Sequence, residues 1–138
     1  MKILSSASCD ELAQGMRTVG GDRGAATLRG PETGLVMLRG RIGGAGNPFN
    51  FGEATVTRAT VRIATGETGH SCVIGRDGEK ARLCAIMDAL WQRQETRTAV
   101  EENIIVPVRR RLEAEERERR EKVAATRVDF FTMVRGDD

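Results

Sequence analysis

The sequence of 138 residues contains no tyrosine, a single tryptophan (Trp91) and only four phenylalanines. Its core must therefore consist mainly of Val, Leu, Ile, Ala and Met side chains. The charged stretch 109–122 cannot contribute to this core, so the core is thin for the length of the chain. The length suits one domain, 1–138, and we expect this domain to gain stability from bound partners.

Other features are also absent, and each absence excludes a class of protein. Cys9, Cys72 and Cys84 fit neither a C-x-x-C pair nor a zinc-ligand spacing, and no signal-peptide pattern precedes them. We therefore expect free thiols, no metal site and a cytoplasmic protein. No apolar run is long enough to cross a bilayer. The 22 Lys and Arg nearly balance the 20 Asp and Glu, which argues against a protein that coats nucleic acid.

The N-terminal segment predicts a short helix. Ser8 and Glu11 have the spacing of a capping box. The apolar residues that follow recur at helical spacing, and glycines from Gly20 onward end the pattern. The dipeptide Gly30-Pro31 predicts a turn before the next element.

Three runs predict the strands of a small, mostly antiparallel sheet. The run 35–42 predicts the first strand, and its alternation places Arg39 and Arg41 on one face. The run 53–64 is rich in β-branched residues and predicts the second strand. Its apolar residues fall on both parities, which indicates either a bulge or burial of both faces. A short third strand at 70–75 completes a hairpin with a loop longer than two residues.

The C-terminal half predicts helices. Asp77 can cap a helix with a broad apolar face. After a polar break at 94–98, a charged helical arm is expected over 101–125, in which Pro107 is tolerable only in a first turn or at a kink. A last strand is expected at 128–134. The fold class is therefore α+β, with the sheet packed by an N-terminal helix and two helices of the C-terminal half, the last one long and charged.

Three segments carry a resemblance to a known family. They are residues 31–58, 75–90 and 128–137. The string R-G-R-x-G-G-x-G-x-P-F-N, which begins at Arg39, and the string V-D-F-F-T-x-V-R-G of the last segment are far more specific than a lone glycine motif. In order and spacing, these segments resemble the PhnG subunits of the bacterial carbon–phosphorus lyase system. Residues 1–30, with their predicted helix, resemble the family less clearly.

The resemblance implies a role in organophosphonate catabolism. The family belongs to a complex that exchanges the adenine of a nucleoside triphosphate for a phosphonate, giving a ribose 1-phosphonate 5-triphosphate. An iron–sulfur cluster and S-adenosylmethionine belong to another subunit, so the resemblance implies no cofactor in this chain. It implies an accessory or assembly subunit with PhnH-, PhnI- and PhnJ-like partners, without nucleic acid or membrane. We expect the isolated chain to self-associate when these partners are absent.

The expected site has two interpretations, and neither assigns a catalytic residue or a metal ligand. In the first, the glycine-rich loop 43–52 and its neighbours dock on a partner chain. In the second, arginines and backbone N–H groups of the same region bind the triphosphate or the phosphonate directly. The loop matches neither a P-loop nor a dinucleotide fingerprint, so we adopt the first interpretation. The candidates for either role are Arg39, Arg41, Gly43, Gly44, Gly46, Asn50, Glu53 and Arg58.

Further candidates come from apolar residues that need cover and from a possible acid–base pair. The partner-interface candidates are Phe49, Phe51, Phe130, Phe131 and Arg135. A general acid–base pair would have to combine His70, the single histidine, with Glu53. The pattern favours this pair only weakly, because a histidine directly after a glycine turn usually lies at the end of a strand.

Overall fold

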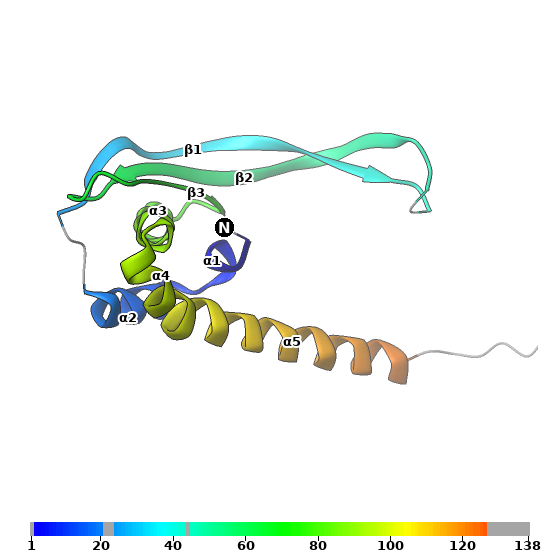
Figure 1. Cartoon of the computed structure of the whole chain (residues 1–138). Coiled ribbons are helices and arrows are strands. Elements are labelled where there is room, and N and C mark those ends of the chain that lie inside the picture. Colours follow the sequence, from blue (N-terminus) through cyan, green and yellow to red (C-terminus); the bar gives the residue numbers. More distant parts are fainter. Residues whose placement is uncertain (1, 21–23, 44, 127–138) are drawn as a thin grey trace, which may run out of the picture.

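The computed structural model describes residues 2–20, 24–43 and 45–126. In chain order, the elements are α1 (Lys2–Ser6), α2 (Cys9–Val19), β1 (Ala26–Arg41), β2 (Pro48–Arg62), β3 (Thr68–Ile74), α3 (Gly78–Gln92), α4 (Gln94–Val100), the π-helical turn η1 (Glu101–Ile105) and α5 (Val106–Ala125). The three strands form an antiparallel sheet in the order β1-β2-β3. Figure 1 shows this sheet on one side of α3, with α2, α4 and α5 on the other and α1 beside α3. The arrangement confirms the α+β class.

The N-terminal helix forms where the capping pattern predicts it. The N–H of Glu11 donates to Ser8 Oγ at 3.1 Å, and the N–H of Ser8 donates to Glu11 Oε2 at 2.7 Å, so α2 begins with a complete capping box. It ends at Gly20, whose φ of 109° is a left-handed conformation that favours glycine. The short helix α1 precedes it.

The core lies between the inner face of the sheet and the helices. Gly69 of β3 permits the closest approach, because a Cβ at this position would lie 1.9 Å from the carbonyl oxygen of Ala85 in α3. The described core is aliphatic, as the composition predicts. Its largest buried hydrophobic side chains are Leu12, Ile63, Ile86, Met87, Leu90, Ile104, Val61, Val73, Val100 and Val108.

The first two strands are longer than the sequence predicts. The expected turn at Gly30-Pro31 is wrong, because β1 continues through it while paired with β2. The register shifts between Arg29 and Glu32, and such a bulge accommodates a proline on an edge strand. Of the two alternatives left open for the second strand, burial of both faces holds only at Val56, which is buried although its parity is opposite to that of the buried Val61. Further along the same face as Val56, Arg58 and Arg62 are exposed. The loop before β3 is longer than two residues, as expected.

A continuous helix occupies most of the C-terminal third. The expected polar break at 94–98 is wrong, because this stretch forms α4, and only Arg93 interrupts the helices there. From α4 through η1 to α5 the residues at the junctions keep right-handed helical angles. Pro107 lies at the start of α5, directly after the π-helical turn, as its missing N–H requires. The strand expected at 128–134 lies outside the described residues.

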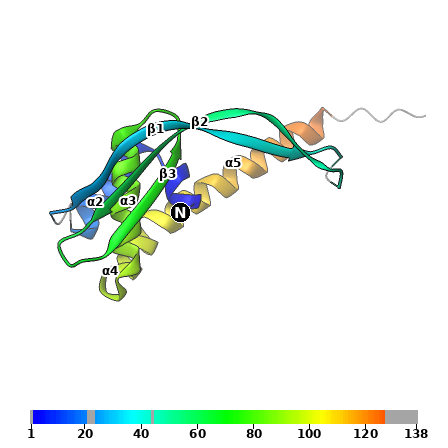
Figure 2. The same ribbon diagram turned by 90° about the horizontal axis from the view of Figure 1, so that it is seen from above.

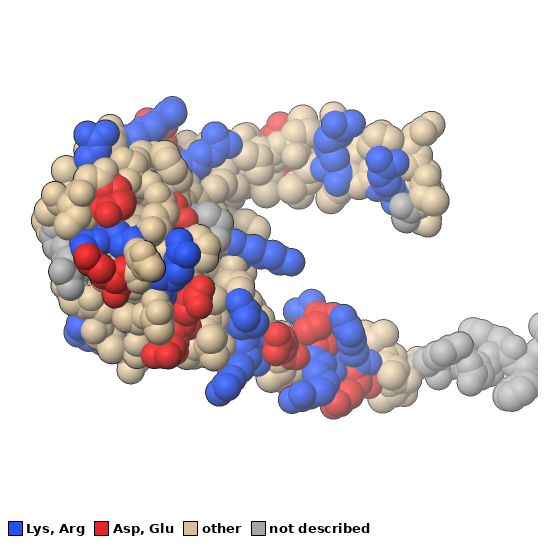
Figure 3. Space-filling model, in the orientation of Figure 1, with Lys and Arg blue, Asp and Glu red and all other residues tan. Residues whose placement is uncertain are grey.

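Two arms extend from the helical body to the same side. One is the end of the β1–β2 hairpin, and the other is α5 (Figures 1 and 2). The space-filling view in Figure 3 shows a C-shaped outline, with open space between the arms. We call residues 35–41 and 48–55 the distal hairpin, because the last pair between β2 and β3 is Val56 with Ile74. None of the described helices is long and apolar enough to cross a membrane.

Candidate partner interface

The distal hairpin exposes large apolar side chains on both of its faces. Leu35 and Met37 are 62% and 54% exposed. Leu35 pairs with Thr55 and Met37 pairs with Glu53, and these partners alternate along β2 in step with the buried Thr57. Leu35 and Met37 therefore lie on the inner face, which is the face of the sheet that packs on the helices in the body of the molecule.

The two phenylalanines of the distal hairpin lie on the opposite, outer face. Phe49 pairs with Gly40, and Phe51 is an extra residue of β2 at a register shift. Their rings are tilted by 55° with centroids 6.1 Å apart. A Cβ on Gly40 would lie 3.2 Å from the Phe51 ring and 3.8 Å from the Phe49 ring, so the absent side chain leaves room for both. Phe49 and Phe51 are nevertheless 44% and 59% exposed.

This arrangement is unfavourable for an arm surrounded by water. An isolated two-stranded hairpin is marginal, because it needs another layer or strand to bury its apolar face. A strand pair with apolar side chains on both faces needs cover on both sides. A contiguous exposed apolar patch of this kind marks a site of protein association. The distal hairpin is therefore the best candidate interface in the described part of the chain.

The glycine-rich loop is a tight turn. The N–H of Gly46 donates to the carbonyl of Ile42 at 2.9 Å. A Cβ on Gly46 would lie 2.6 Å from that carbonyl oxygen, and Gly43 has a φ of 61°. Arg41 donates to the carbonyl of Gly46 at 3.1 Å and so closes the turn from the side. The backbone conformation of the turn is therefore sufficient reason for glycine at positions 43 and 46. Gly44 lies outside the described residues.

The other polar candidates are dispersed. Arg39 shares the parity of Met37 and pairs with Asn50 across the hairpin. Arg58 of β2 pairs with Glu32 of β1. Glu32 and Arg39 are seven residues apart along β1, so Arg58 lies about 23 Å along the sheet from Arg39. Arg58 also has the parity of the outer face. The structure therefore brings Arg39, Arg41 and Asn50 together at the hairpin end but leaves Arg58 apart.

The possible acid–base pair is not assembled in this chain. His70 pairs with Thr60, which lies seven residues from Glu53, or about 23 Å along β2. His70 Nδ1 shares a hydrogen bond of 3.2 Å with Thr60 Oγ1, and the His70 N–H donates to Asp88 Oδ2 at 3.0 Å. Asp88 thus links α3 to β3. Phe130, Phe131 and Arg135 lie outside the described residues.

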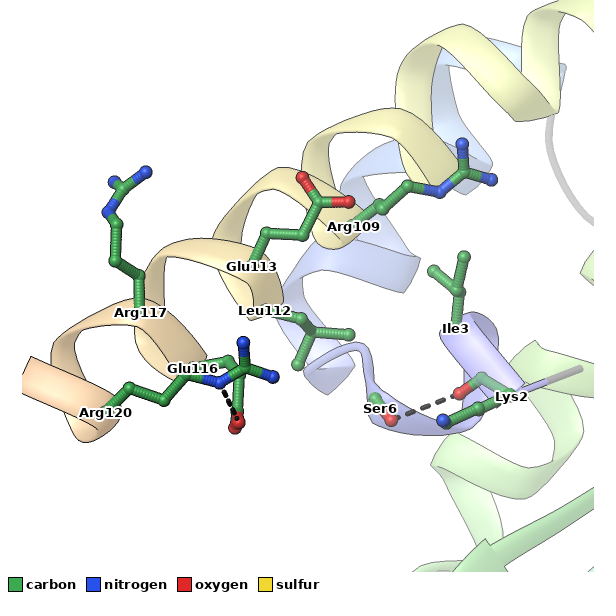
Figure 4. A pocket seen from close by; sticks show the side chains of 9 residues that line it. All are labelled: Lys2, Ile3, Ser6, Arg109, Leu112, Glu113, Glu116, Arg117 and Arg120. Carbon is green, nitrogen blue, oxygen red and sulfur yellow. Dashed lines mark hydrogen bonds and ion pairs between the residues drawn. The ribbon is translucent and has the colours of Figure 1, made fainter. Parts of the chain in front are cut away.

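A groove at the base of the second arm is also open to a partner. It has a volume of about 650 Å³ and lies between α1 and α5. Figure 4 shows Ile3 and Leu112 directed into the space between the two helices. Its charged lining residues are Lys2, Arg109, Glu113, Glu116, Arg117 and Arg120. Glu116 pairs with Arg120 at 3.0 Å, so this surface joins a small apolar floor to a charged rim.

Arg111 fixes the base of α5 to the N-terminal helices, a role that the sequence pattern did not reveal. Its guanidinium donates to both carboxylate oxygens of Glu11, at 2.9 and 3.1 Å, and to the carbonyl of Ser6 at 3.1 Å. Glu115 accepts a further hydrogen bond at 2.8 Å. The hydrogen bond from Arg111 lowers the pKa of the Glu11 carboxyl. The capping residue of α2 therefore also positions the second arm.

The cysteines do not form a reactive or metal-binding centre in the described structure. Cys84 is buried, and its Sγ donates to the carbonyl of Leu4 at 3.2 Å. Burial raises the pKa of this thiol to about 12. Among the described residues, no three His, Cys, Asp or Glu side chains lie close enough together to hold a metal ion.

Comparison with known proteins gives the class of the chain. The family described as "Phosphonate metabolism protein PhnG" matches residues 1–136. A relative from Rhizobium meliloti (strain 1021), named alpha-D-ribose 1-methylphosphonate 5-triphosphate synthase subunit PhnG, is 54% identical over 138 residues; the match covers 100% of this chain and 88% of the relative. The chain is a phosphonate metabolism protein and belongs to the PhnG family. This confirms the resemblance found in the sequence, and the match includes residues 1–30, where that resemblance was less clear.

Proposed function

We propose that the chain is an accessory, non-catalytic subunit of the cytoplasmic complex that forms ribose 1-phosphonate 5-triphosphate from a nucleoside triphosphate and a phosphonate. Its task is to assemble the complex by binding PhnH-, PhnI- or PhnJ-like subunits. The chain itself holds no cofactor, and the iron–sulfur chemistry belongs to another subunit. The 54% identical relative, whose name describes a subunit of such a synthase, supports this proposal.

The single observation that carries the assembly role is the distal hairpin with apolar side chains on both faces. A surface that binds only small polar substrates has no use for Leu35, Met37, Phe49 and Phe51 at these exposures. Aromatic side chains are also enriched among the residues that dominate protein–protein binding. The groove between α1 and α5 offers a second contact on the other arm.

A second candidate function is direct binding of the triphosphate by the hairpin end. One observation favours it: Arg39 contacts no acidic side chain within the described ranges, so its guanidinium is available to an anion. The same arginine can equally meet a carboxylate of a partner. Exchange of Arg39 and Arg41 together for alanine distinguishes the two. An assembly role predicts weaker complex formation and a near-normal KM in the complex that still forms, whereas a substrate role predicts intact assembly and a lower kcat/KM.

The assembly role is tested by reconstitution. The remaining synthase subunits are purified without this chain, and binding of the wild-type chain is compared with that of the variant Phe49→Ala/Phe51→Ala. Removal of two aromatic anchors is expected to weaken binding by about thirtyfold or more. Leu28→Ala is the matched control, because Leu28 is also apolar and 48% exposed but lies outside the distal hairpin. Its affinity should stay within about twofold of the wild type.

Circular dichroism of each variant establishes that the fold is retained. Equal binding of the double variant and the wild type would contradict a hairpin-mediated assembly role. Turnover of a nucleoside triphosphate by the purified chain alone would contradict the non-catalytic role.

A further inference from the structure

β2 is longer than its neighbour β3, and the difference leaves one edge of the hairpin open. β3 ends at Ile74, opposite Val56. The chain then turns away at Gly75, whose φ of 95° is left-handed, and enters α3. On the side of β2 that β3 occupies nearer the body, no strand of the described structure pairs with residues 48–55. Within the described structure this edge of β2 is therefore unpaired, and we call the space beside it, in line with β3, the lane.

Backbone groups point into this lane. The N–H of Gly75 donates to the carbonyl of Thr55 at 2.9 Å, so the carbonyl of Thr55 points toward the β3 side. Backbone groups along a strand alternate between its two edges, and residue 53 therefore directs its N–H and C=O to the same side. Its partner across the hairpin, Met37, directs its own groups to the opposite, outer edge of β1.

Nearer the body, both β2 and the outer edge of β1 are protected. β3 covers β2, and the outer edge of β1 carries Pro31 and two register irregularities. Proline and bulges are devices by which proteins prevent another chain from pairing with an edge. In the distal hairpin, the lane beside β2 has such devices only toward its far end, where Pro48 begins the strand and Phe51 is the extra residue at a register shift. Residues 52–55, next to the end of β3, carry neither a proline nor a register shift. The whole lane is about 26 Å long, for eight residues at the usual rise of a strand.

The side chains around the lane suit an incoming protein segment. Ile74, at its inner end, is 81% exposed, and Phe51 is 59% exposed. Both lie on the outer face, so apolar side chains of an added strand would cover them. On the inner face, Arg39 of β1 lies across β2 from the lane and has no acidic partner among the described residues. Its long side chain would reach over β2 to a carboxylate of the added segment.

We infer that another subunit of the synthase adds an extended segment to this edge of β2, in line with β3. The segment pairs with the backbone at Glu53, covers Ile74 and Phe51 with apolar side chains, and offers a carboxylate to Arg39. The inference rests on the proposed function, because the occupant is a synthase subunit. It goes further by stating which edge is used and what kind of segment is bound, which is the mode of strand addition to an exposed edge.

The test compares two variants of one residue. Glu53→Pro removes the N–H that points into the lane, and Glu53→Ala removes the same side chain but keeps the N–H. A proline is tolerated on an edge strand where its nitrogen faces solvent, so the hairpin is retained. Binding of the remaining synthase subunits to Glu53→Pro should be at least about tenfold weaker than to Glu53→Ala, since a hydrogen bond is lost and the ring obstructs the added strand.

The opposite edge provides the matched control. Met37→Pro and Met37→Ala differ in the same way, but the N–H of residue 37 points to the outer edge of β1. These two variants should bind with affinities within about twofold of each other. A loss confined to Met37→Pro would place the added strand on β1 and overturn the inference.

Amide hydrogen exchange of the full chain gives a second readout that does not depend on a variant. The N–H of Glu53 should exchange rapidly in the isolated chain and become protected in the complex. Protection in the isolated chain would show that a second copy or another part of this chain fills the lane, and would overturn the inference. If the wild type binds the synthase subunits while Glu53→Pro and Glu53→Ala bind equally, strand addition is refuted and the assembly role stands. If the wild type does not bind them, the assembly role itself fails.

Discussion

The contact between α2 and η1 provides a test of how the second arm is attached to the body. Gly15 lies in the middle of α2, and a Cβ at this position would lie 2.2 Å from Cγ1 and 2.4 Å from Cδ1 of Ile104. Ile104 is only 1% exposed, so its side chain has no free space into which it can rotate. The glycine therefore permits η1, and with it the start of α5, to lie directly against α2.

Two opposing terms determine the effect of Gly15→Ala. In a helix interior, alanine is more favourable than glycine by about 1 kcal/mol. Overpacking of a well-filled core costs about 1 to 3 kcal/mol, and the overlap with two carbons of one buried side chain indicates the upper half of this range. We expect a net loss of about 1 to 2 kcal/mol in the free energy of unfolding.

Removal of the obstructing carbons should reverse the sign. Ile104→Ala alone costs about 2 to 5 kcal/mol, because it leaves a cavity. In that background the new methyl group of Gly15→Ala meets no Cγ1 or Cδ1, so only the helix propensity remains and the chain should gain about 1 kcal/mol. Ile104→Val, which removes only Cδ1, should give an intermediate result.

Urea unfolding of the four chains of this double-mutant cycle, followed by circular dichroism, measures the coupling directly. Trp91 fluorescence provides an independent probe. An equal loss on Gly15→Ala in the wild-type and Ile104→Ala backgrounds would refute the close contact between α2 and η1.

Arg111→Lys and Arg111→Ala should each reduce stability at pH 7, by about 1 kcal/mol for alanine, because both Arg111 and Glu11 are about one-third exposed and solvent weakens their bidentate pair. The ion pair lowers the pKa of Glu11 in the folded chain. The stabilisation by the ion pair is therefore fully present above the unfolded-state pKa of a glutamate, and it is lost as pH falls through the lower folded-state pKa. The urea midpoints of wild type and Arg111→Ala should converge in acid, and a constant difference down to about pH 2.5 would contradict this role. A thiol reagent should label the exposed Cys72 of the native chain rapidly and the buried Cys84 only after unfolding, as mass spectrometry of the labelled peptides would show. Rapid native labelling of Cys84 would contradict its packing.

Local patterns predicted the elements whose signals are contained in a few neighbouring residues. The Ser8 and Glu11 pattern predicted the start of α2, and Asp77 predicted the start of α3, where its carboxylate accepts from the N–H of Lys80 at 2.8 Å. Gly20 predicted the end of α2. In each case the group that ends or begins the helix bonds within four residues of itself, so the sequence contains the whole interaction.

Elements that depend on distant partners were not predicted at their full length. Gly30-Pro31 is a turn signal, but pairing with β2 and a bulge keep it extended. The polar stretch 94–98 has no apolar periodicity, yet it is helical because Thr96 is buried and donates to the carbonyl of Leu90. Tertiary contacts decide both cases, and a single sequence does not contain them.

In the candidate site, too, some features were visible in the local sequence and others depend on distant parts of the fold. The motif that begins at Arg39 drew attention to the hairpin end, because its glycines and phenylalanines are unusual for a strand. The contribution of Leu35 and Met37 was missed, since they read as ordinary members of a half-buried strand. Only the length of the hairpin beyond β3 shows that both faces are exposed there.

The distal hairpin lies outside the core, and this separates assembly from stability. The core cluster includes residues of every helix and of β2 and β3, but no residue of the distal hairpin. The rings of Phe49 and Phe51 contact each other beside Gly40, and neither residue belongs to the core cluster, so their exchange leaves the core contacts in place. Changes at Gly15 or Arg111 instead act on the packing that fixes α5. An assembly defect without a change in the free energy of unfolding therefore identifies the hairpin as the interface, whereas a defect that accompanies lost stability reports on the position of the second arm.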